Sequence, residues 1–305
     1  MAPNGQRTVN GLTLHALSGS TSSGYNPNLY LVGPGRTYAP AETLPVAANH
    51  AIQRALDAAA SYVGASTSNA ARGALVVVFP NNPSANPRQN PRGAYYENLI
   101  ISAKVKLQGV GPGSPDGSVR GSIIDGGAFA GDSPVATDWY TTLTARTWSG
   151  NQTINDGAVI SLFLPSTGRT AFPTGSYNAN TAPSIDGFDL RGGDQQGFPG
   201  NINVIGGGPT GQPGGLVTQG GAIFANGYAN NLQITNNVVQ NNGGAYGTIR
   251  IGTPDLDGTQ GDNNNDNVVI AYNRIIANAG TNQAGGIGLF RGSDNFTVAR
   301  NDICG

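Results

Sequence analysis

The stretch Asn231-Leu-Gln-Ile234-Thr-Asn-Asn237-Val-Val239 occurs three times in related form in the C-terminal part of the chain. The other two copies are Asn267-Val-Val-Ile270-Ala-Tyr-Asn273-Arg-Ile275 and Asn295-Phe-Thr-Val298-Ala-Arg-Asn301-Asp-Ile303. Each copy reads N-x-x-[I/V]-x-x-N-x-[I/V], and successive copies are separated by 36 and 28 residues. A fixed motif between spacers of unequal length is typical of a solenoid, because its inward residues repeat while its loops vary in length.

Short apolar segments between the motifs predict a second set of strands. These segments are Ala222-Ile-Phe224, Thr248-Ile-Arg-Ile251 and Gly286-Ile-Gly-Leu289. Alternation along a strand points Ile249 and Ile251 inward and predicts that Arg250 is exposed.

The second Asn of each motif is predicted to stack on its counterpart in the next coil, as Asn237, Asn273 and Asn301. The first two copies also share an Asn five residues later, Asn242 and Asn278. Asn tolerates the left-handed backbone that a tight turn requires, and stacked Asn side chains can hydrogen-bond to one another. A helical repeat would not tolerate this density of Asn and Gly, and a propeller would repeat at about 40–50 residues. The sequence therefore predicts an all-β protein, a parallel β-helix.

One helix precedes the first regular strands. From residue 46 to residue 64 the apolar side chains, among them Ile52 and Leu56, fall at helical spacing, and Gly64 stands at the position of a C-terminal cap. The continuous apolar run Ala74-Leu-Val-Val-Val-Phe79 follows and predicts a buried strand. We expect this amphipathic helix to cap the open N-terminal end of the sheets.

The N-terminal half resembles a known family. The helix Ala51-Ile-Gln-Arg-Ala-Leu-Asp-Ala-Ala59, the strand after it and Tyr96-Glu-Asn-Leu-Ile-Ile101 are similar to the N-terminal cap and first coils of pectate-lyase-like proteins. The Asn-rich repeats resemble later coils of the same superfamily, including carbohydrate-binding and sugar-hydrolase repeats. The resemblance covers roughly residues 30–127 and 183–305 and implies a right-handed parallel β-helix. It does not select one chemistry, because this fold serves lyases, hydrolases, esterases and adhesins alike.

Composition limits the partners and the location. The chain has 305 residues with a formal net charge of −1, so electrostatics does not favour nucleic acid or an anionic membrane. No apolar run reaches the length of a membrane span, and the lone Cys304 excludes an intrachain disulfide. The low charge and the many Gly, Asn, Ser and Thr residues favour an extracellular or cell-surface protein.

The chain divides into an irregular segment, residues 1–29, and a single β-helix domain, residues 30–305. Residues 128–183 do not follow the coil pattern and are interpreted as a long insertion. The last motif stops at Ile303 without a second strand, so we expect a truncated end at which Val298 and Ile303 face water. Further domains of the same longer chain would then be partners.

Aromatic and Arg side chains on successive second strands suggest a substrate-binding surface. Phe224, Arg250, Phe290 and Arg291 could hold an acidic sugar, by ring stacking and by bidentate bonding to a carboxylate. Alternatively, the two Phe rings pack under loops. Asp186, Asp189 and Asp194 are interpreted as exposed turn carboxylates.

Four carboxylates lie close together in sequence before the second motif: Asp255, Asp257, Asp262 and Asp266. Calcium prefers oxygen ligands from Asp, Asn and backbone carbonyls on a Gly-containing loop, so a Ca²⁺ site is one interpretation. The spacing is not that of an EF-hand. The other interpretation is a solvated, turn-rich insertion between coils.

Three functions remain open. The first is a secreted or surface β-helix that contacts polysaccharide or another glycan without a complete catalytic site. The second is a polysaccharide lyase, with Ca²⁺ and an Arg base, or a glycoside hydrolase acting on an acidic polysaccharide such as pectin. The carboxylate pair of a hydrolase cannot be identified in the chain, and its only histidines, His15 and His50, lie outside the Gly-His-Gly setting of polygalacturonases. The third is a structural spacer.

Overall fold

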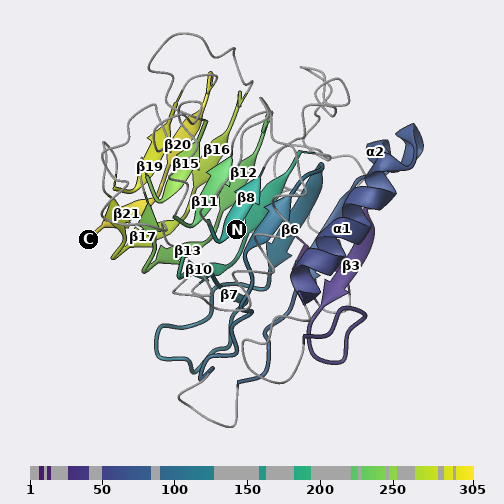
Figure 1. Ribbon diagram of the computed structural model, residues 1–305, viewed down its shortest axis with the longest axis horizontal. Coiled ribbons are helices and arrows are strands. Elements are labelled where there is room, and N and C mark those ends of the chain that lie inside the picture. The colour runs from purple at the N-terminus through teal and green to yellow at the C-terminus, as the bar shows by residue number, and fades with distance from the viewer. Residues whose placement is uncertain are drawn as a thin grey trace, which may run out of the picture.

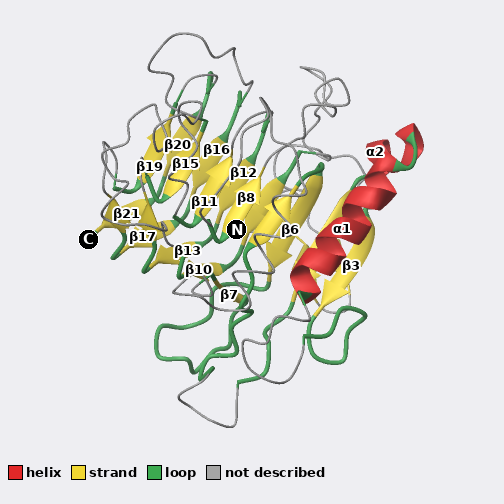
Figure 2. Ribbon diagram, viewed as in Figure 1, coloured by secondary structure: helices red, strands yellow, loops and turns green. Residues whose placement is uncertain are grey.

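The computed structural model describes residues 7–9, 12–14, 27–40, 50–83, 90–126, 158–162, 182–193, 221–225, 229–244, 247–252, 265–280, 285–290 and 293–305. Within these ranges the chain is mostly β, with two helices, α1 (Ala51–Gly64) and α2 (Thr67–Arg72) (Figure 2).

Three parallel sheets make up most of the structure. Sheet 1 contains, in spatial order, β3 (Asn28–Val32), β4 (Ala74–Val78), β6 (Val105–Gly109), β9 (Ser184–Asp186), β12 (Gln233–Thr235), β16 (Val269–Ala271) and β20 (Thr297–Ala299). Sheet 2 contains β7 (Ile123–Asp125), β10 (Asp189–Arg191), β13 (Val238–Gln240), β17 (Arg274–Ile276) and β21 (Asp302–Cys304). Sheet 3 contains β5 (Leu99–Ile101), β8 (Ile160–Leu162), β11 (Ile223–Ala225), β15 (Ile249–Ile251) and β19 (Ile287–Leu289).

Two small pairs complete the strands of the described residues. β14 (Gly243–Gly244) pairs with β18 (Ala279–Gly280) in parallel, and β1 (Arg7–Val9) pairs with β2 (Leu12–Leu14) in antiparallel.

From β5 onward the chain visits sheets 3, 1 and 2 in turn, and each strand pairs with the strand one circuit earlier. We call one such circuit a coil. The strands lie side by side in a stack, with α1 and β3 at one end and β19, β20 and β21 at the other (Figure 1). This all-parallel order is consistent with a parallel β-helix. One sheet 3 strand, β8, lies inside the segment predicted as an insertion, so that segment does carry part of the coil pattern.

The predicted repeat is confirmed by the strand register. Ile185, Ile234, Ile270 and Val298 stand opposite one another across sheet 1. The first three are fully buried in the core between the sheets, whereas Val298 in the terminal coil is 43% exposed. Ile303, the aliphatic residue of the last coil in sheet 2, is 51% exposed.

The predicted Asn stack is also confirmed, as a hydrogen-bonded ladder. Asn237 Nδ2 donates to Asn273 Oδ1 at 3.0 Å, and Asn273 Nδ2 donates to Asn301 Oδ1 at 3.0 Å. A second ladder joins Asn242 Nδ2 to Asn278 Oδ1 at 3.0 Å. Each Asn also bonds to backbone of the preceding coil; Asn273 Nδ2, for example, donates to the Ile234 carbonyl at 2.9 Å. These amides therefore satisfy backbone groups at turns that would otherwise be buried without partners.

The left-handed residues are only partly those expected. The first Asn of each motif has positive φ, 60° at Asn231 and 57° at Asn267. At the second Asn the expectation was wrong, because the residue before it takes the left-handed conformation, with φ of 60° at Tyr272 and 55° at Arg300. In this turn one residue adopts the left-handed backbone conformation, and the Asn after it supplies the side-chain hydrogen bonds.

Helix α1 packs its apolar side into the core against the first strands, with Ile52, Leu56 and Val63 buried. Gln53 completes the free edge of sheet 3: its Nε2 donates to the Ile100 carbonyl at 3.1 Å, and the Ile100 N–H donates to its Oε1 at 2.7 Å. Both oxygens of the buried Glu97 accept N–H groups of the first turn of the helix, from Ile52 at 3.1 Å and Gln53 at 3.0 Å.

The predicted helix boundaries need correction. The described helix begins at Ala51, and residues 46–49 lie outside the described residues. The C-terminal cap is Ala65 in a right-handed conformation, whereas Gly64 is the last helical residue. The short helix α2 was not expected; Ser66 Oγ caps it by accepting the Asn69 N–H at 3.1 Å. Neither described helix is long and apolar enough to cross a bilayer.

Candidate functional site

The predicted aromatic and Arg surface does come together on the outer side of sheet 3. The guanidinium carbon of Arg250 lies 4.8 Å from the centre of the Phe224 ring and 5.9 Å from that of Phe290. However, Arg250 and Phe224 are fully buried and Phe290 is half-buried, so the expectation that Arg250 is exposed was wrong. Arg250 Nε donates to the Gly252 carbonyl at 3.2 Å. Arg291 lies outside the described residues.

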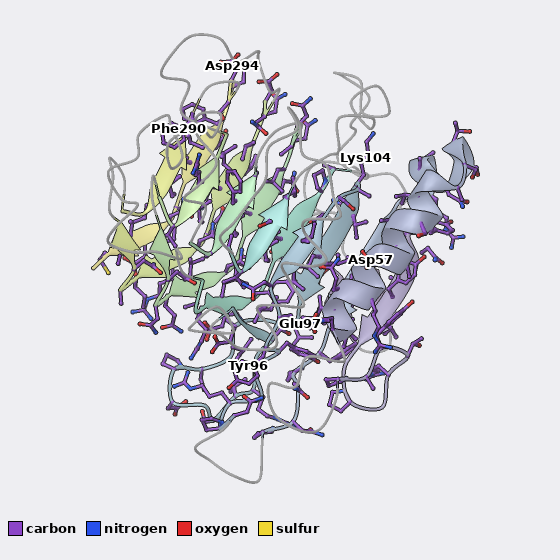
Figure 3. All side chains as sticks on the ribbon, in the orientation of Figure 1. Asp57, Tyr96, Glu97, Lys104, Phe290 and Asp294 are labelled. Carbon is purple, nitrogen blue, oxygen red and sulfur yellow. The ribbon has the colours of Figure 1, made fainter. Side chains whose placement is uncertain are left out.

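Of the predicted calcium ligands, only Asp266 is described; Asp255, Asp257 and Asp262 lie outside the described residues. Asp266 belongs to a third ladder, because its N–H donates to Asn230 Oδ1 at 2.9 Å and its own Oδ1 accepts the N–H of Asp294 at 3.1 Å. Phe290 and Asp294 both lie in the last coils of the stack (Figure 3). Among the described residues, no group of three or more His, Cys, Asp or Glu side chains could hold a metal ion.

Asp186 and Asp189 are buried, which corrects their interpretation as exposed turn carboxylates, and Asp194 lies outside the described residues. Asp186 projects from the outer side of sheet 1, where its Oδ1 accepts Thr235 Oγ1 at 2.7 Å and Asn236 Nδ2 at 2.6 Å. Lys106 lies on the adjacent strand β6 and is also buried. Burial lowers the pKa of Lys106 to about 8, although the charge of Asp186 opposes that shift.

The short side chain of Ser184 separates the long side chains of Lys106 and Gln233 on the outer side of sheet 1. Across sheet 1, Ser184 stands between Lys106 and Gln233, and all three are buried. Gln233 Oε1 has no hydrogen-bond partner in the part of the chain that the structure describes. Lysine pKa values lowered by burial beside a specific carboxylate are found more often at functional sites than elsewhere, so this cluster is the candidate for acid–base chemistry.

The outer side of sheet 2 is polar and more open. Because Leu190, Val239 and Ile275 point into the core, their neighbours in β10, β13 and β17 point outward. These neighbours form two columns that cross the strands. One contains Ile123, Asp189, Val238, Arg274 and Asp302, and the other contains Asp125, Arg191, Gln240, Ile276 and Cys304.

Polar contacts join these side chains within one strand, between neighbouring coils and between the two columns. Arg191 forms an ion pair with Asp189, and Gln240 Nε2 donates to both oxygens of Asp189 at 3.0 and 3.1 Å. In the next coils Arg274 Nε lies 3.5 Å from Asp302 Oδ2, with both side chains more than half exposed. The exposure of these side chains increases toward the last coils.

Tyr96 lies at the end of the outer side of sheet 2 that is formed by the first coils. Tyr96 is half-buried and lies near Glu97 in the first coils (Figure 3). Its pKa is raised, first by burial and then by the charge of Asp125, while Arg191 opposes the shift. The outer side of sheet 2 therefore offers carboxylate, amide, guanidinium and phenol groups in rows across the strands. Such groups suit a ligand rich in hydroxyls.

Arg274 and Asp302 went unnoticed because they occupy variable positions of the repeated motif. The available signal was the alternation that follows the second Asn: if Ile275 and Ile303 point inward, then the residues before them point outward.

No family model matches the chain, and neither a curated protein nor a solved structure matches it.

Proposed function

We propose that the chain is a right-handed parallel β-helix, with α1 as its N-terminal cap, that contacts polysaccharide or another glycan outside the cell without cleaving it. The parallel sheets and their strand order support the β-helix. The side-chain amide of Gln53, which pairs with the edge of β5 as a neighbouring strand would, supports the capping role.

The polar outer side of sheet 2 carries this proposal. Its side chains repeat at the spacing of parallel strands, about 4.8 Å, so a linear ligand can meet similar groups at each coil. Asp189, Arg191 and Gln240 already hold one another in place, and Arg274 and Asp302 extend the row into solvent. Fixed polar groups bind a hydroxyl-rich ligand with little loss of side-chain freedom.

The same contacts argue against hydrolysis at this surface. Glycoside hydrolysis requires two carboxyl groups, one of them able to donate a proton. Both oxygens of Asp189 accept hydrogen bonds from Gln240, and Arg191 forms an ion pair with the same carboxylate, so these oxygens already have partners. Asp189 is therefore better suited to orient neighbouring side chains than to act as a general acid.

The test is binding to a panel of immobilised polysaccharides, with reducing ends measured in the same incubations. We expect retention on at least one polysaccharide without new reducing ends. Retention should fall at least about tenfold in the double variant Gln240→Ala/Arg274→Ala, and it should be unchanged in Arg120→Ala, an exposed residue outside this surface. Binding to no glycan would refute the proposal and favour a structural spacer.

A polysaccharide lyase is the second candidate, because Lys106 is a lysine whose neutral form is accessible near neutral pH. With a pKa of about 8, a lysine can accept a proton from a carbon next to a uronate carboxylate, which here requires the substrate to reach the buried amine. Incubation with uronic-acid polymers, with and without added Ca²⁺, would reveal unsaturated products by their ultraviolet absorbance. Their formation by the wild type and its loss in Lys106→Met would replace the non-catalytic proposal.

A further inference from the structure

In four successive coils, from β9 to β21, the corner between sheets 1 and 2 is left-handed. The residues there are Gly187, Asn236, Tyr272 and Arg300, with φ of 79°, 57°, 60° and 55°. Gly and Asn adopt this conformation readily, whereas residues with larger side chains do so at a conformational cost. The last two of these coils therefore carry residues that the left-handed backbone disfavours, Tyr272 and Arg300. The two coils before them carry Gly187 and Asn236, which adopt this conformation at lower cost.

The two disfavoured residues present their side chains to solvent. The Tyr272 ring remains 55% exposed even though the guanidinium carbon of Arg300 lies 5.5 Å from its centre. Neither side chain forms a hydrogen bond or an ion pair with any residue in the described ranges. All the guanidinium donors of Arg300 are thus available to a ligand, and its position over the ring limits its freedom.

Neither residue is needed for the turn itself. The ladder of Asn237, Asn273 and Asn301 supplies the hydrogen bonds of this corner, and it does so equally beside Asn236, Tyr272 and Arg300. A purely structural explanation would require Tyr272 and Arg300 to stabilise the coils, but an exposed cation–π pair contributes little.

We propose that Tyr272 and Arg300 form an anion-binding corner that takes a negatively charged substituent of a glycan. This inference rests on the proposed function, because the corner borders the outer side of sheet 2 at Arg274. Arg300 bonds to two oxygens of a carboxylate or sulfate in the fork geometry that guanidinium favours. Tyr272 holds the guanidinium in place and stacks on the sugar ring that bears the anion.

The test uses two matched pairs of oligosaccharides of equal length: a uronic-acid oligomer with its methyl ester, and dextran sulfate with dextran. Dissociation constants are measured for the wild type, Tyr272→Asn, Arg300→Asn and the control Arg120→Asn, which removes the same charge elsewhere. We expect at least one charged oligomer to bind at least about tenfold more tightly than its neutral partner. Both corner variants should lose that preference, and Arg120→Asn should keep it.

The same variants separate a binding role from a structural one. Because Asn accepts the left-handed conformation, Tyr272→Asn and Arg300→Asn should leave the midpoint of thermal unfolding unchanged or raise it by about 1–3 °C. A lowered midpoint together with weaker binding would make the pair structural and overturn the inference.

The remaining outcomes distinguish the inference from the proposed function. Equal affinity for charged and neutral oligomers would leave the glycan-binding function standing and overturn the anion-binding corner. Binding of no oligomer would overturn both. Preference for the uronate alone or the sulfate alone supports the inference and identifies the anion.

Discussion

We expect the side-chain amide of Gln53 to hold α1 onto the edge of sheet 3. Replacing Gln53 by Met should therefore lower the stability of the protein. Met has nearly the shape of Gln but no amide. The Ile100 N–H and carbonyl, now bonded to Gln53 at 2.7 and 3.1 Å, would both be left buried without a partner. Each orphaned group costs about 1–3 kcal/mol, so the free energy of unfolding should fall by about 2–6 kcal/mol for the two groups.

Urea unfolding followed by circular dichroism measures this loss, and light scattering measures the second consequence. An unpaired β5 edge invites edge-to-edge association, so the variant should form oligomers at concentrations where the wild type does not. Ser61→Met, on the exposed side of the same helix, is the matched control and should change stability by less than about 0.5 kcal/mol. A loss below about 0.5 kcal/mol in Gln53→Met, with no association, would refute the argument that α1 caps this edge. Deletion of residues 46–64 should cause aggregation for the same reason, and a soluble, monomeric deletion variant would count against the cap.

Three further outcomes are expected. Ile270→Ala should cost about 2–5 kcal/mol of unfolding free energy in urea titrations, as for other core truncations, and a loss below about 1 kcal/mol would mean that the residue is not interior. Asn273→Ala should destabilise more than Asn301→Ala in the same assay, because Asn273 serves coils on both sides of it; equal losses would contradict the ladder. Burial raises the pKa of Glu97 to about 7, so the folded state holds a proton that the unfolded state has released. Stability should therefore fall by about 3 kcal/mol as the pH rises from about 4.5 to 7, and the difference from Glu97→Gln should be confined to that window.

The sequence could predict the strands and their register because both depend on short, repeated features. An inward aliphatic residue such as Ile234 and an Asn three residues later, such as Asn237, are set by alternation and by turn chemistry within one motif. Both effects are local, and the repetition showed which residues align. The strand β4 was predicted from a different local feature, the continuous apolar run from Ala74 to Phe79.

The outer sides of the sheets could not be predicted in this way. Alternation correctly pointed Arg250 outward, but whether an outward side chain meets solvent depends on distant parts of the chain. Arg250, Lys106 and Asp186 all lie on outer sides and are nevertheless buried. The lowered pKa of Lys106 follows from that burial, so it could not be predicted from the sequence either.

The corner positions show how this chain separates folding from function. The Asn ladder fixes the turn through the side chain of one residue, so the left-handed residue before it needs only to tolerate its backbone. Asn236, Tyr272 and Arg300 all fill that position, each directly before an Asn of the ladder. Variable positions of the motif that point outward are equally unconstrained by the core. At the outward columns, binding groups can therefore accumulate without disturbing the core, and at the corners they do so at a conformational cost. Under the proposed function, substitutions at both places should change glycan binding far more than they change unfolding.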